Sequence, residues 1–536
     1  MKKSTSTHTT ISFKDTGYFN AIMVDYLDKK KVSKSFYQNF PDLEGFKNQI
    51  ILKSKSFKNQ SRPVLVAALE VQYNNVTTSK ATQNNIESLK NKNTFTVTTG
   101  HQLNLFTGPL YFLYKIVSAI NLAKKLKSNF PDKDFVPVYW MATEDHDFEE
   151  INYFNFKGEK IKWTHPFSTG VGRLNNDGLE AVFETFSKIL GNNKKATYLK
   201  DLFEKAYLEH NTLAEATFYL ANTLFKDYGL IIIDADKPAL KSLFKDAIKD
   251  ELLNKTCYKT VSESAQKLAN LNYKVQVNPR DINLFYLIDD LRSRLVFENN
   301  LYKVLDTDIS FTKEAILKEV DNHPERFSPN VLMRPLYQEI ILPNLCYIGG
   351  GGELAYWFEM KSYFEACNVA FPILLLRNSV LIYNKFQKKK LEKLGLTIID
   401  LFLEQQQLVD KTVKDISDLE IDFSNQKKQI QKMFSDLKVL SDKTDKSFLG
   451  AVKAQEHKQL KGLSVLEKRL LKAQKRKYNE LVNRVVSIQN QLFPNKSLQE
   501  RVLNFSELYL EYGDDLIPEL VNNLDPLALE FSLIEF

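Results

Sequence analysis

The stretch TTGHQLNLFTGP, residues 98–109, lies between a run typical of a β-strand and a run typical of a helix. A loop that joins a parallel strand to a helix is where open α/β sheets bind ligands, because free backbone N–H groups and the helix dipole attract anions. Gly100 and Gly108 would let the backbone approach a phosphate closely. His101 and Gln102 could donate hydrogen bonds to it. The pattern matches neither a Walker A loop nor GxGxxG, so a turn capped by histidine is the alternative.

A second stretch, WMATEDHDFEEIN at residues 140–152, gathers four ionisable side chains. They are Glu144, Asp145, His146 and Asp147. If this stretch and the first leave parallel strands at the same sheet edge, they face one another, as a general base or a metal-assisted phosphoryl site would require. Consecutive residues do not share one face of a regular element, so at most two of the four can point into the crevice. Acidic residues that cap the next helix are the alternative.

The third stretch, RFSPNVLMRPLYQEIILPNLCYIGGGGELAYW, spans residues 326–357 and contains four consecutive glycines. Glycines followed by an acid and two aromatic residues suggest a wall built against a ligand. The candidate substrate-binding residues here are Asn330, Gly350, Glu353, Tyr356 and Trp357. Arg334 and Arg377 are candidates for binding carboxylate or phosphate, since guanidinium binds both in a bidentate manner, or for buried structural ion pairs.

Four apolar runs predict the strands that position these stretches. They begin near residues 94, 135, 230 and 371 and have the continuous apolar character of strands that are buried on both faces. Residues 109–126 show helical spacing between the first two runs, which predicts a parallel βαβ unit and a doubly wound sheet within residues 94–380. Residues 155–227 and 241–325 are too long for loops, so we expect inserted helical subdomains there. Residues 1–93 are expected to pack on this core.

Residues 381–495 predict a separate helical arm. No proline occurs between Pro372 and Pro494, and apolar residues recur every three or four positions in two long segments. The polar stretch at 441–450 would turn the chain, so we expect an antiparallel coiled coil that mediates dimerisation, with residues 496–536 returning to the core. Between residues 381 and 490 there are 23 Lys and Arg against 14 Asp and Glu, but few aromatic residues interleave them. A solvated helix face therefore fits this segment better than a nucleic-acid groove.

The composition indicates a globular chain of several structural units. It has 536 residues, 43% hydrophobic and 26% charged, with a net charge of +7. Neither a signal peptide nor an apolar run long enough to span a membrane is present, so we expect a cytoplasmic protein without a membrane or nucleic-acid partner. The three cysteines are widely spaced and unpaired by any CxxC motif, which predicts buried free thiols and neither a disulfide framework nor a zinc site, while the use of another metal stays open.

Five collinear motifs carry a resemblance to a known family: TGHQLNLFTGPLYFLYKIVSAI, VPVYWMATEDHDFEEIN, RFSPNVLMRPLYQEIILP, GELAYW and LFPNKSLQER. Together they resemble the cysteine-adding enzymes of bacillithiol biosynthesis, a family of cysteine ligases, along nearly the whole chain. The family usually has TGQQ where this chain has TGHQ. This difference favours Gln102 and the backbone amides, rather than His101, as the groups with an essential role. The resemblance implies a Rossmann-like parallel sheet core with connecting insertions and a coiled-coil arm used in a homodimer.

The resemblance also implies a reaction, the joining of L-cysteine to the amine of glucosaminyl-malate. An amine does not displace hydroxide from a carboxylate at a useful rate, so we expect ATP or another adenine nucleotide to activate the carboxyl group. Backbone amides at Gly100–Gln102 and Gly108 would hold the phosphates. Glu144 or Asp147, or His146 instead, would orient the amine and accept its proton, assisted by Gln102. Arg334 or Arg377 would bind the malate carboxylates.

Two other functions fit the same residues. The Glu144–Asp147 cluster could belong to a metal-dependent phosphohydrolase or a nucleotidyl transferase. The chain could also be a coiled-coil scaffold whose α/β domain only senses a nucleotide. An activity that needs an amine acceptor would exclude the hydrolase. A change of arm geometry on nucleotide binding without turnover would favour the scaffold.

Overall fold

The computed structural model describes residues 7–166, 169–441, 443 and 446–536. The chain divides into two compact units. The core unit comprises residues 8–381 and 499–532, and the arm unit comprises residues 382–498 with both ends of the chain. The predicted site residues all belong to the core unit.

A five-stranded parallel sheet forms the centre of the core unit. Its order is β13-β12-β2-β3-β6, and every neighbouring pair is parallel. The strands are β2 (Thr94–His101), β3 (Asp134–Met141), β6 (Ile231–Asp234), β12 (Asn344–Gly349) and β13 (Ile373–Leu376). This confirms the predicted doubly wound, Rossmann-like sheet. Four strands match the predicted runs, whereas β12 was missed because its six residues precede the glycine run that suggested a ligand wall.

The order of the strands reverses beside β2. From β2 the chain passes through α5 (Tyr111–Asn129) to β3 and then to β6, and it returns to the other side of β2 for β12 and β13. Open α/β sheets bind ligands outside the carboxyl ends of the strands at such a reversal, because the loops on either side diverge and leave a crevice. The topology therefore predicts a site at the carboxyl ends of β2 and β12.

Helix α5 packs against β2 and β3 and has an almost entirely buried sequence. Its Ala119, Leu122 and Leu126 join Phe95 and Val97 of β2 in one apolar cluster. The turn before it holds Phe106 and Thr107 at positive φ. The Nδ2 atom of buried Asn504 donates to the carbonyls of Phe106 and Gly108, both at 2.7 Å, so the C-terminal part of the core unit fixes this turn.

The N-terminal helices pack against the sheet. Helix α2 (Leu43–Ser56) contacts β12 and β13, and α3 (Ser61–Tyr73) and α4 (Lys80–Ser88) contact β6. The first insertion is largely helical, with a short hairpin of β4 (Tyr153–Phe156) and β5 (Glu159–Lys162) before its helices α7 (Leu179–Leu190), α8 (Lys194–Tyr207) and α9 (Leu213–Phe225).

The prediction of a helical subdomain at residues 241–325 is wrong, because much of this second insertion forms β-strands. After α11 (Lys245–Asn254) and α12 (Thr256–Asn270) the chain builds an antiparallel sheet of order β10-β9-β8-β7-β11. Its strands are β7 (Leu284–Ile288), β8 (Leu291–Glu298), β9 (Leu301–Val304), β10 (Ser310–Phe311) and β11 (Phe327–Pro329). The sequence signal was the pair of turns Asp289-Asp290 and Asn299-Asn300 between apolar runs, which is typical of hairpins.

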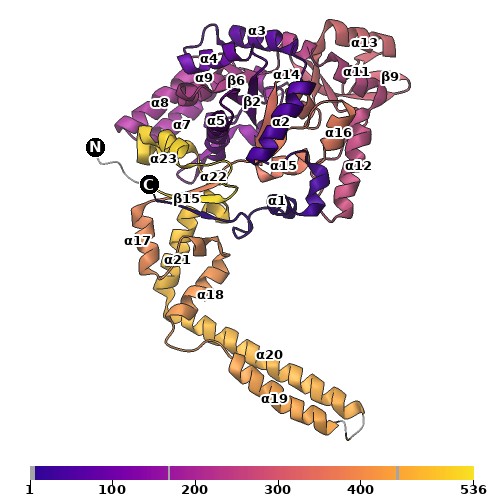
Figure 1. Ribbon diagram of the computed structural model, residues 1–536. Helices are drawn as coiled ribbons and strands as arrows, with labels where there is room; N and C mark the ends of the chain where they lie inside the picture. Colours follow the sequence, from indigo (N-terminus) through magenta and orange to yellow (C-terminus); the bar gives the residue numbers. More distant parts are fainter. Residues whose placement is uncertain (1–6, 167–168, 442, 444–445) are drawn as a thin grey trace. The chain divides into compact units, whose positions relative to one another are not determined.

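The arm unit contains the predicted antiparallel hairpin of long helices (Figure 1). Helix α19 (Ser424–Ser441) lies against α20 (Lys446–Lys477), while α18 (Gln405–Ile416) packs on α21 (Asn479–Leu492). The helical coiled-coil region is thus confirmed. None of the helices in the described part of the chain combines the length and the apolar character that crossing a membrane requires.

Candidate functional site

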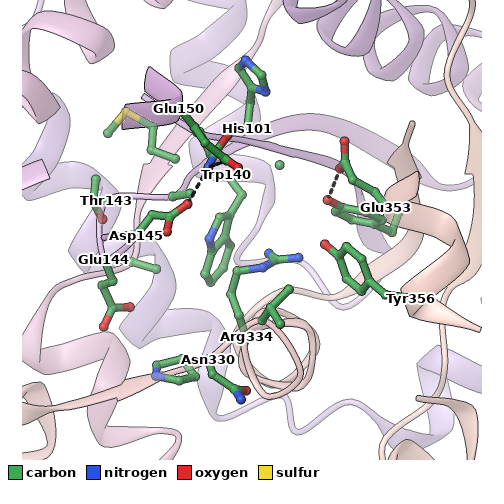
Figure 2. Close-up of a pocket in the computed structure, with 18 of the residues that line it drawn as sticks. His101, Trp140, Thr143, Glu144, Asp145, Glu150, Asn330, Arg334, Glu353 and Tyr356 are labelled. Carbon is green, nitrogen blue, oxygen red and sulfur yellow. Dashed lines mark hydrogen bonds between the residues drawn. The ribbon is translucent and has the colours of Figure 1, made fainter. Parts of the chain in front are cut away.

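A cavity of about 400 Å³, called here the first cavity, opens at the carboxyl ends of β2, β3 and β12. This is the position that the strand reversal predicts. Figure 2 shows Thr143, Glu144 and Asp145 on one side of it, Glu353 and Tyr356 on the opposite side, and Arg334 between them. Nine residues that the sequence singled out line it: Gly100, His101, Gln102, Glu144, Asp145, Asn330, Arg334, Glu353 and Tyr356.

The two turns that the sequence placed at one sheet edge do meet there. The Nε2 atom of Gln102 donates to Asp145 Oδ2 and to Glu150 Oε2, both at 2.9 Å. Burial alone would raise the pKa of Asp145, but hydrogen bonds from His146 and Gln102 lower it to about 2. Asp145 is therefore a fixed negative charge that orients Gln102, and it is poorly suited to accept a proton.

Glu144 has a different environment from its neighbour. Its side chain accepts a hydrogen bond from the ammonium group of fully buried Lys241. Burial raises the pKa of Glu144, an effect that Lys241 partly opposes. A carboxylate in a cavity with a raised pKa is suited to accept a proton near neutral pH. Of the two acids of the EDHD stretch that line the cavity, Glu144 is the candidate base.

The opposite side of the cavity is built around a buried lysine. Lys115 Nζ lies 2.5 Å from Glu353 Oε1 and donates to the carbonyl of Gly100 at 2.8 Å. The hydroxyl of Tyr347 donates to Glu353 Oε2 at 2.9 Å. A Cβ atom on Gly100 would lie 3.1 Å from that hydroxyl, so a larger residue at this position would press on the side chain of Tyr347. The charge of Lys115 is thus matched by Glu353.

Arg334 is the cation in this wall with spare hydrogen-bonding capacity. It begins α14 (Arg334–Ile341), and its Nη1 donates to Gln338 Oε1 at 3.1 Å. Its Nη2 is buried and has no hydrogen-bond acceptor within the described ranges. The guanidinium carbon lies 5.7 Å from the ring centre of Trp140 and 5.5 Å from that of Tyr347. A buried donor without a partner is costly, so the geometry favours an anionic ligand at Nη2.

Arg292 of β8 brings a second guanidinium to the same cavity. It stacks over the ring of Phe285 at 3.8 Å, and its Nε donates to Ser328 Oγ at 3.2 Å. Its Nη1 donates to His146 Nδ1 at 2.9 Å. The second insertion therefore supplies a cation to the site, which no motif in the sequence indicated.

Six predicted site residues do not line the first cavity: Gly108, His146, Asp147, Gly350, Trp357 and Arg377. Gly108 lies in the turn that Asn504 holds, and a Cβ atom there would lie 2.6 Å from Asn104. Exposed His146 bonds to Arg292, and exposed Asp147 precedes the short helix α6 (Phe148–Ile151).

Arg377 forms a buried structural ion pair, which was the alternative to a role in ligand binding. It is buried, its Nη2 donates to Glu500 Oε1 at 2.8 Å, and its Nη1 donates to the carbonyl of Asn378 at 2.9 Å. Gly350 precedes α15 (Gly351–Trp357), where its N–H donates to Glu353 at 3.4 Å. Trp357 is buried and stacks on Tyr347 with ring centres 4.3 Å apart. These residues support the wall of the cavity from behind.

His101 lines the cavity as a neutral, buried ring. It packs against Tyr111 and Phe112 with ring centres 5.4 and 5.2 Å away. In Figure 2 its ring points away from the labelled carboxylates. Burial, reinforced by the charges of Lys115 and Arg377, lowers the pKa of His101 well below its usual value. A packing role for His101 fits this arrangement better than a phosphate contact.

A second cavity of about 1440 Å³ lies on the other flank of β3 and shares Met141 and Thr143 with the first. Two ion pairs line it, Arg173 with Asp236 and Lys237 with Asp234. The hydroxyl of Thr143 donates to Asp234 Oδ1 at 2.6 Å, so this side chain stands between the cavities. Within the described residues, no group of three or more His, Cys, Asp or Glu is arranged to hold a metal ion.

Comparison with known proteins places the whole chain in one family. Residues 7–378 match the model described as "Bacillithiol biosynthesis BshC, N-terminal Rossmann-like domain", and residues 380–536 match its C-terminal coiled-coil domain. Proteins named "Putative cysteine ligase BshC" are similar over nearly their full lengths. One from Christiangramia forsetii is 55% identical over 98% of both chains. One from Flavobacterium johnsoniae is 55% identical over 98% of this chain and 99% of its own. One from Bacillus cereus is 30% identical over 93% of this chain and 95% of its own.

The neutral state of His101 predicts an acid-sensitive core unit. An unfolded histidine binds a proton as the pH falls through about 6.5, whereas folded His101 does not until a much lower pH, so stability falls below pH 6.5 by up to about 1.4 kcal/mol per pH unit. His101→Gln removes this titration. We expect the urea midpoint to fall less between pH 7 and pH 5 in this variant than in the wild type.

Tryptophan fluorescence is the appropriate measurement, because Trp140, Trp163 and Trp357 all lie in the core unit. Exposed His8 is the control, since His8→Gln should keep the wild-type difference between the two pH values. An unchanged difference in His101→Gln would show that His101 is protonated in the folded state.

Proposed function

The chain belongs to the bacillithiol biosynthesis BshC family, and we propose that it is a ligase that joins L-cysteine to the amine of glucosaminyl-malate. The observation that carries the proposal is that one cavity holds both a candidate base, Glu144, and a guanidinium with an unpartnered Nη2, Arg334. The proposed acceptor needs both, because it carries an amine and two carboxylates.

A ligase must bring two substrates to one point. The two cavities share Met141 and Thr143 and so offer two volumes that meet at one rim of the sheet. ATP or another adenine nucleotide would supply the activation of the cysteine carboxyl group. The groups of the first cavity suited to its phosphates are the side chain of Lys115 and the backbone at Gly100–Gln102, where the absence of a Cβ atom on Gly100 leaves room.

We expect the arginines of the first cavity to bind the carboxylates of the acceptor. Arg334 and Arg292 both line it, whereas Arg377 is held by Glu500 outside it. Guanidinium groups bind carboxylates through paired, charge-assisted hydrogen bonds. Arg292 comes from the second insertion, so that insertion would contribute to recognition of the acceptor.

The attacking amine must lose a proton as the new amide bond forms. Glu144 is the proposed base, because it lines the cavity and burial raises its pKa. The amine nitrogen attacks the activated carboxyl carbon, the activating group leaves with the bonding electrons, and the proton passes to Glu144. Asp145 and Gln102 would hold the amine in place rather than take its proton, since the pKa of Asp145 is about 2.

The proposed enzyme is a homodimer that associates through the α19–α20 hairpin. This hairpin leaves large apolar side chains in solvent although its two helices pack together. Met433 and Leu440 of α19 are 52% and 51% exposed and lie seven residues apart, on one side of the helix. Val465 and Leu466 of α20 are also exposed. An apolar stripe of this kind is suited to a second copy of the same hairpin.

The first test is the reaction itself. The purified chain incubated with L-cysteine, glucosaminyl-malate and ATP is expected to release the joined thiol, identified by mass spectrometry, together with ADP or AMP. The nucleotide product tells how the carboxyl group is activated. Omission of glucosaminyl-malate should stop nucleotide release or leave only a trapped intermediate. No joined product under any condition would exclude the proposed ligase.

The second test concerns the base. Glu144→Gln is expected to lower kcat by roughly 10² or more, because a general base contributes about 10²–10⁴ and glutamine cannot accept the proton. Asp147→Asn is the matched control in the same stretch, and we expect it to keep kcat close to wild type because Asp147 is exposed outside the cavity. The reverse ranking of the two variants would move the base to Asp147.

The third test concerns the homodimer. The chain should sediment as a dimer at micromolar concentration, and Met433→Glu combined with Leu440→Glu should yield a monomer with unchanged helix content. Ile51→Glu places a charge at an equally exposed apolar position of the core unit and should remain dimeric. A dimer that survives the double change would place the interface elsewhere.

A further inference from the structure

Lys241 is a fully buried lysine that lies behind the first cavity and does not line it. It belongs to α10 (Pro238–Ser242), which follows β6, and 97 residues separate it in sequence from Glu144. Its side chain has 0% exposure. The Nζ atom donates to Glu144 Oε1 and, at 2.9 Å, to the carbonyl of Phe327 in β11, and it lies 5.3 Å from the ring centre of Tyr337.

A buried ammonium group needs a negative partner, because the cost of taking it out of water is otherwise several kcal/mol. Glu144 is the only carboxylate in an ion pair with Lys241 within the described ranges. The dependence is mutual, since a buried carboxylate without a cation becomes protonated near neutral pH. The charge states of Lys241 and Glu144 are therefore coupled.

Other titratable groups also face Glu144, and they largely oppose one another. Asp236 after β6 raises the pKa of Glu144, and Arg292 of the second insertion lowers it. Arg173 and Tyr337 also interact with its charge from the first insertion and from α14. Asp145 is next in the chain and lines the same cavity. Lys241 donates a side-chain hydrogen bond to the Glu144 carboxylate and is therefore the direct partner of its charge.

We propose that Lys241 is a positioning residue that keeps Glu144 ionised and directed into the cavity, so that Glu144 can act as a base at neutral pH. The proposal deepens the proposed ligase function and rests on it for its kinetic consequence. It assigns a purpose to a buried lysine that belongs neither to the predicted motifs nor to the lining of the cavity. Lys241 does not touch the substrate and acts through Glu144.

The pH dependence gives this role a specific signature. A base must be ionised, so kcat/KM falls as the pH falls through the pKa of Glu144. Loss of the ammonium group leaves burial and Asp236 to raise that pKa further. In Lys241→Met the acidic limb of the pH profile should therefore move to higher pH, by about 1–3 pH units for an opposite charge at contact distance. Activity lost at pH 7 should return at alkaline pH.

Two further variants separate charge from shape. Lys241→Gln retains a donor for Glu144 and for the Phe327 carbonyl but loses the charge, so we expect the same upward shift. Lys241→Arg retains the charge, so its limb should stay near that of the wild type. A purely structural lysine would instead lower the rate by the same factor at every pH in both Met and Gln variants.

The chain offers a matched control in Lys53. This lysine is also buried and donates to buried Glu339 at 2.7 Å, but neither residue lines the first cavity. Lys53→Met should lower the urea midpoint of the core unit and leave the acidic limb in place. If Lys53→Met moved the limb as far as Lys241→Met, the shift would be a general effect of lost stability and the proposal would be overturned.

An activity-independent measurement distinguishes this inference from the proposed function. Infrared difference spectra of the whole chain against pH report the protonated carboxyl band of Glu144, identified by its absence in Glu144→Gln. The midpoint of that band should rise in Lys241→Met and Lys241→Gln. If no joined thiol forms with any variant, the ligase function fails while this titration still decides the role of Lys241. An unchanged midpoint would refute that role.

Discussion

The parallel register of β2 and β3 is the constraint on which the site depends. Gly100 pairs with Trp140 and His101 with Met141. The two strands therefore end next to each other, and the turns that follow them begin side by side. The hydrogen bonds from Gln102 to Asp145 and Glu150 then close the gap between the turns. A register slip of one residue would turn every side chain of a strand to the opposite face of the sheet. Helix α5, buried along most of its length, and Asn504, which binds the turn before it, hold this register and the loop that leaves it.

Buried ion pairs divide the charges of the core unit into two groups. Arg377 with Glu500 and Lys53 with Glu339 are closed pairs outside the first cavity. Lys115 with Glu353 and Lys241 with Glu144 each place one partner or both in the cavity wall. Removing one member of a buried pair costs about 3–5 kcal/mol, so all four pairs stabilise the fold only as pairs. Arg334 differs because it lines the first cavity with a buried Nη2 that has no acceptor among the described residues, which is an arrangement that a bound anion would complete.

The sequence predicted the parts of the site that depend on local order. Gly100 lies at the end of β2, Gln102 follows β2 and Glu144 follows β3, and parallel strands bring such positions to one edge by geometry alone. Lys115 carried a weak signal, as the single charged residue between positions 110 and 123. Arg292 carried none, because its position depends on how the second insertion folds over the core. The sequence offered no reason to prefer Arg334 or Arg377 as the residue that binds a ligand. The structure distinguishes them, because Arg377 is bound by Glu500, which lies 123 residues away from it in the chain. A contact between residues so far apart in the chain produces no periodic pattern in the sequence.

The insertions turn one edge of the sheet into two adjoining cavities, as the two substrates of the proposed ligase would require. A bare doubly wound sheet offers a shallow crevice at its strand reversal, with the strand ends as its floor. Here η3 (Val171–Arg173) and α9 of the first insertion wall the second cavity, and Arg292 and β11 of the second insertion wall the first. Thr143 divides them, because Gly172 packs so closely on it that a Cβ atom there would lie 2.6 Å from the Cβ atom of Thr143. The two volumes therefore meet at Met141 and Thr143, beside Glu144. In the proposed ligase, a bond formed at that point would need no movement of either substrate across the sheet.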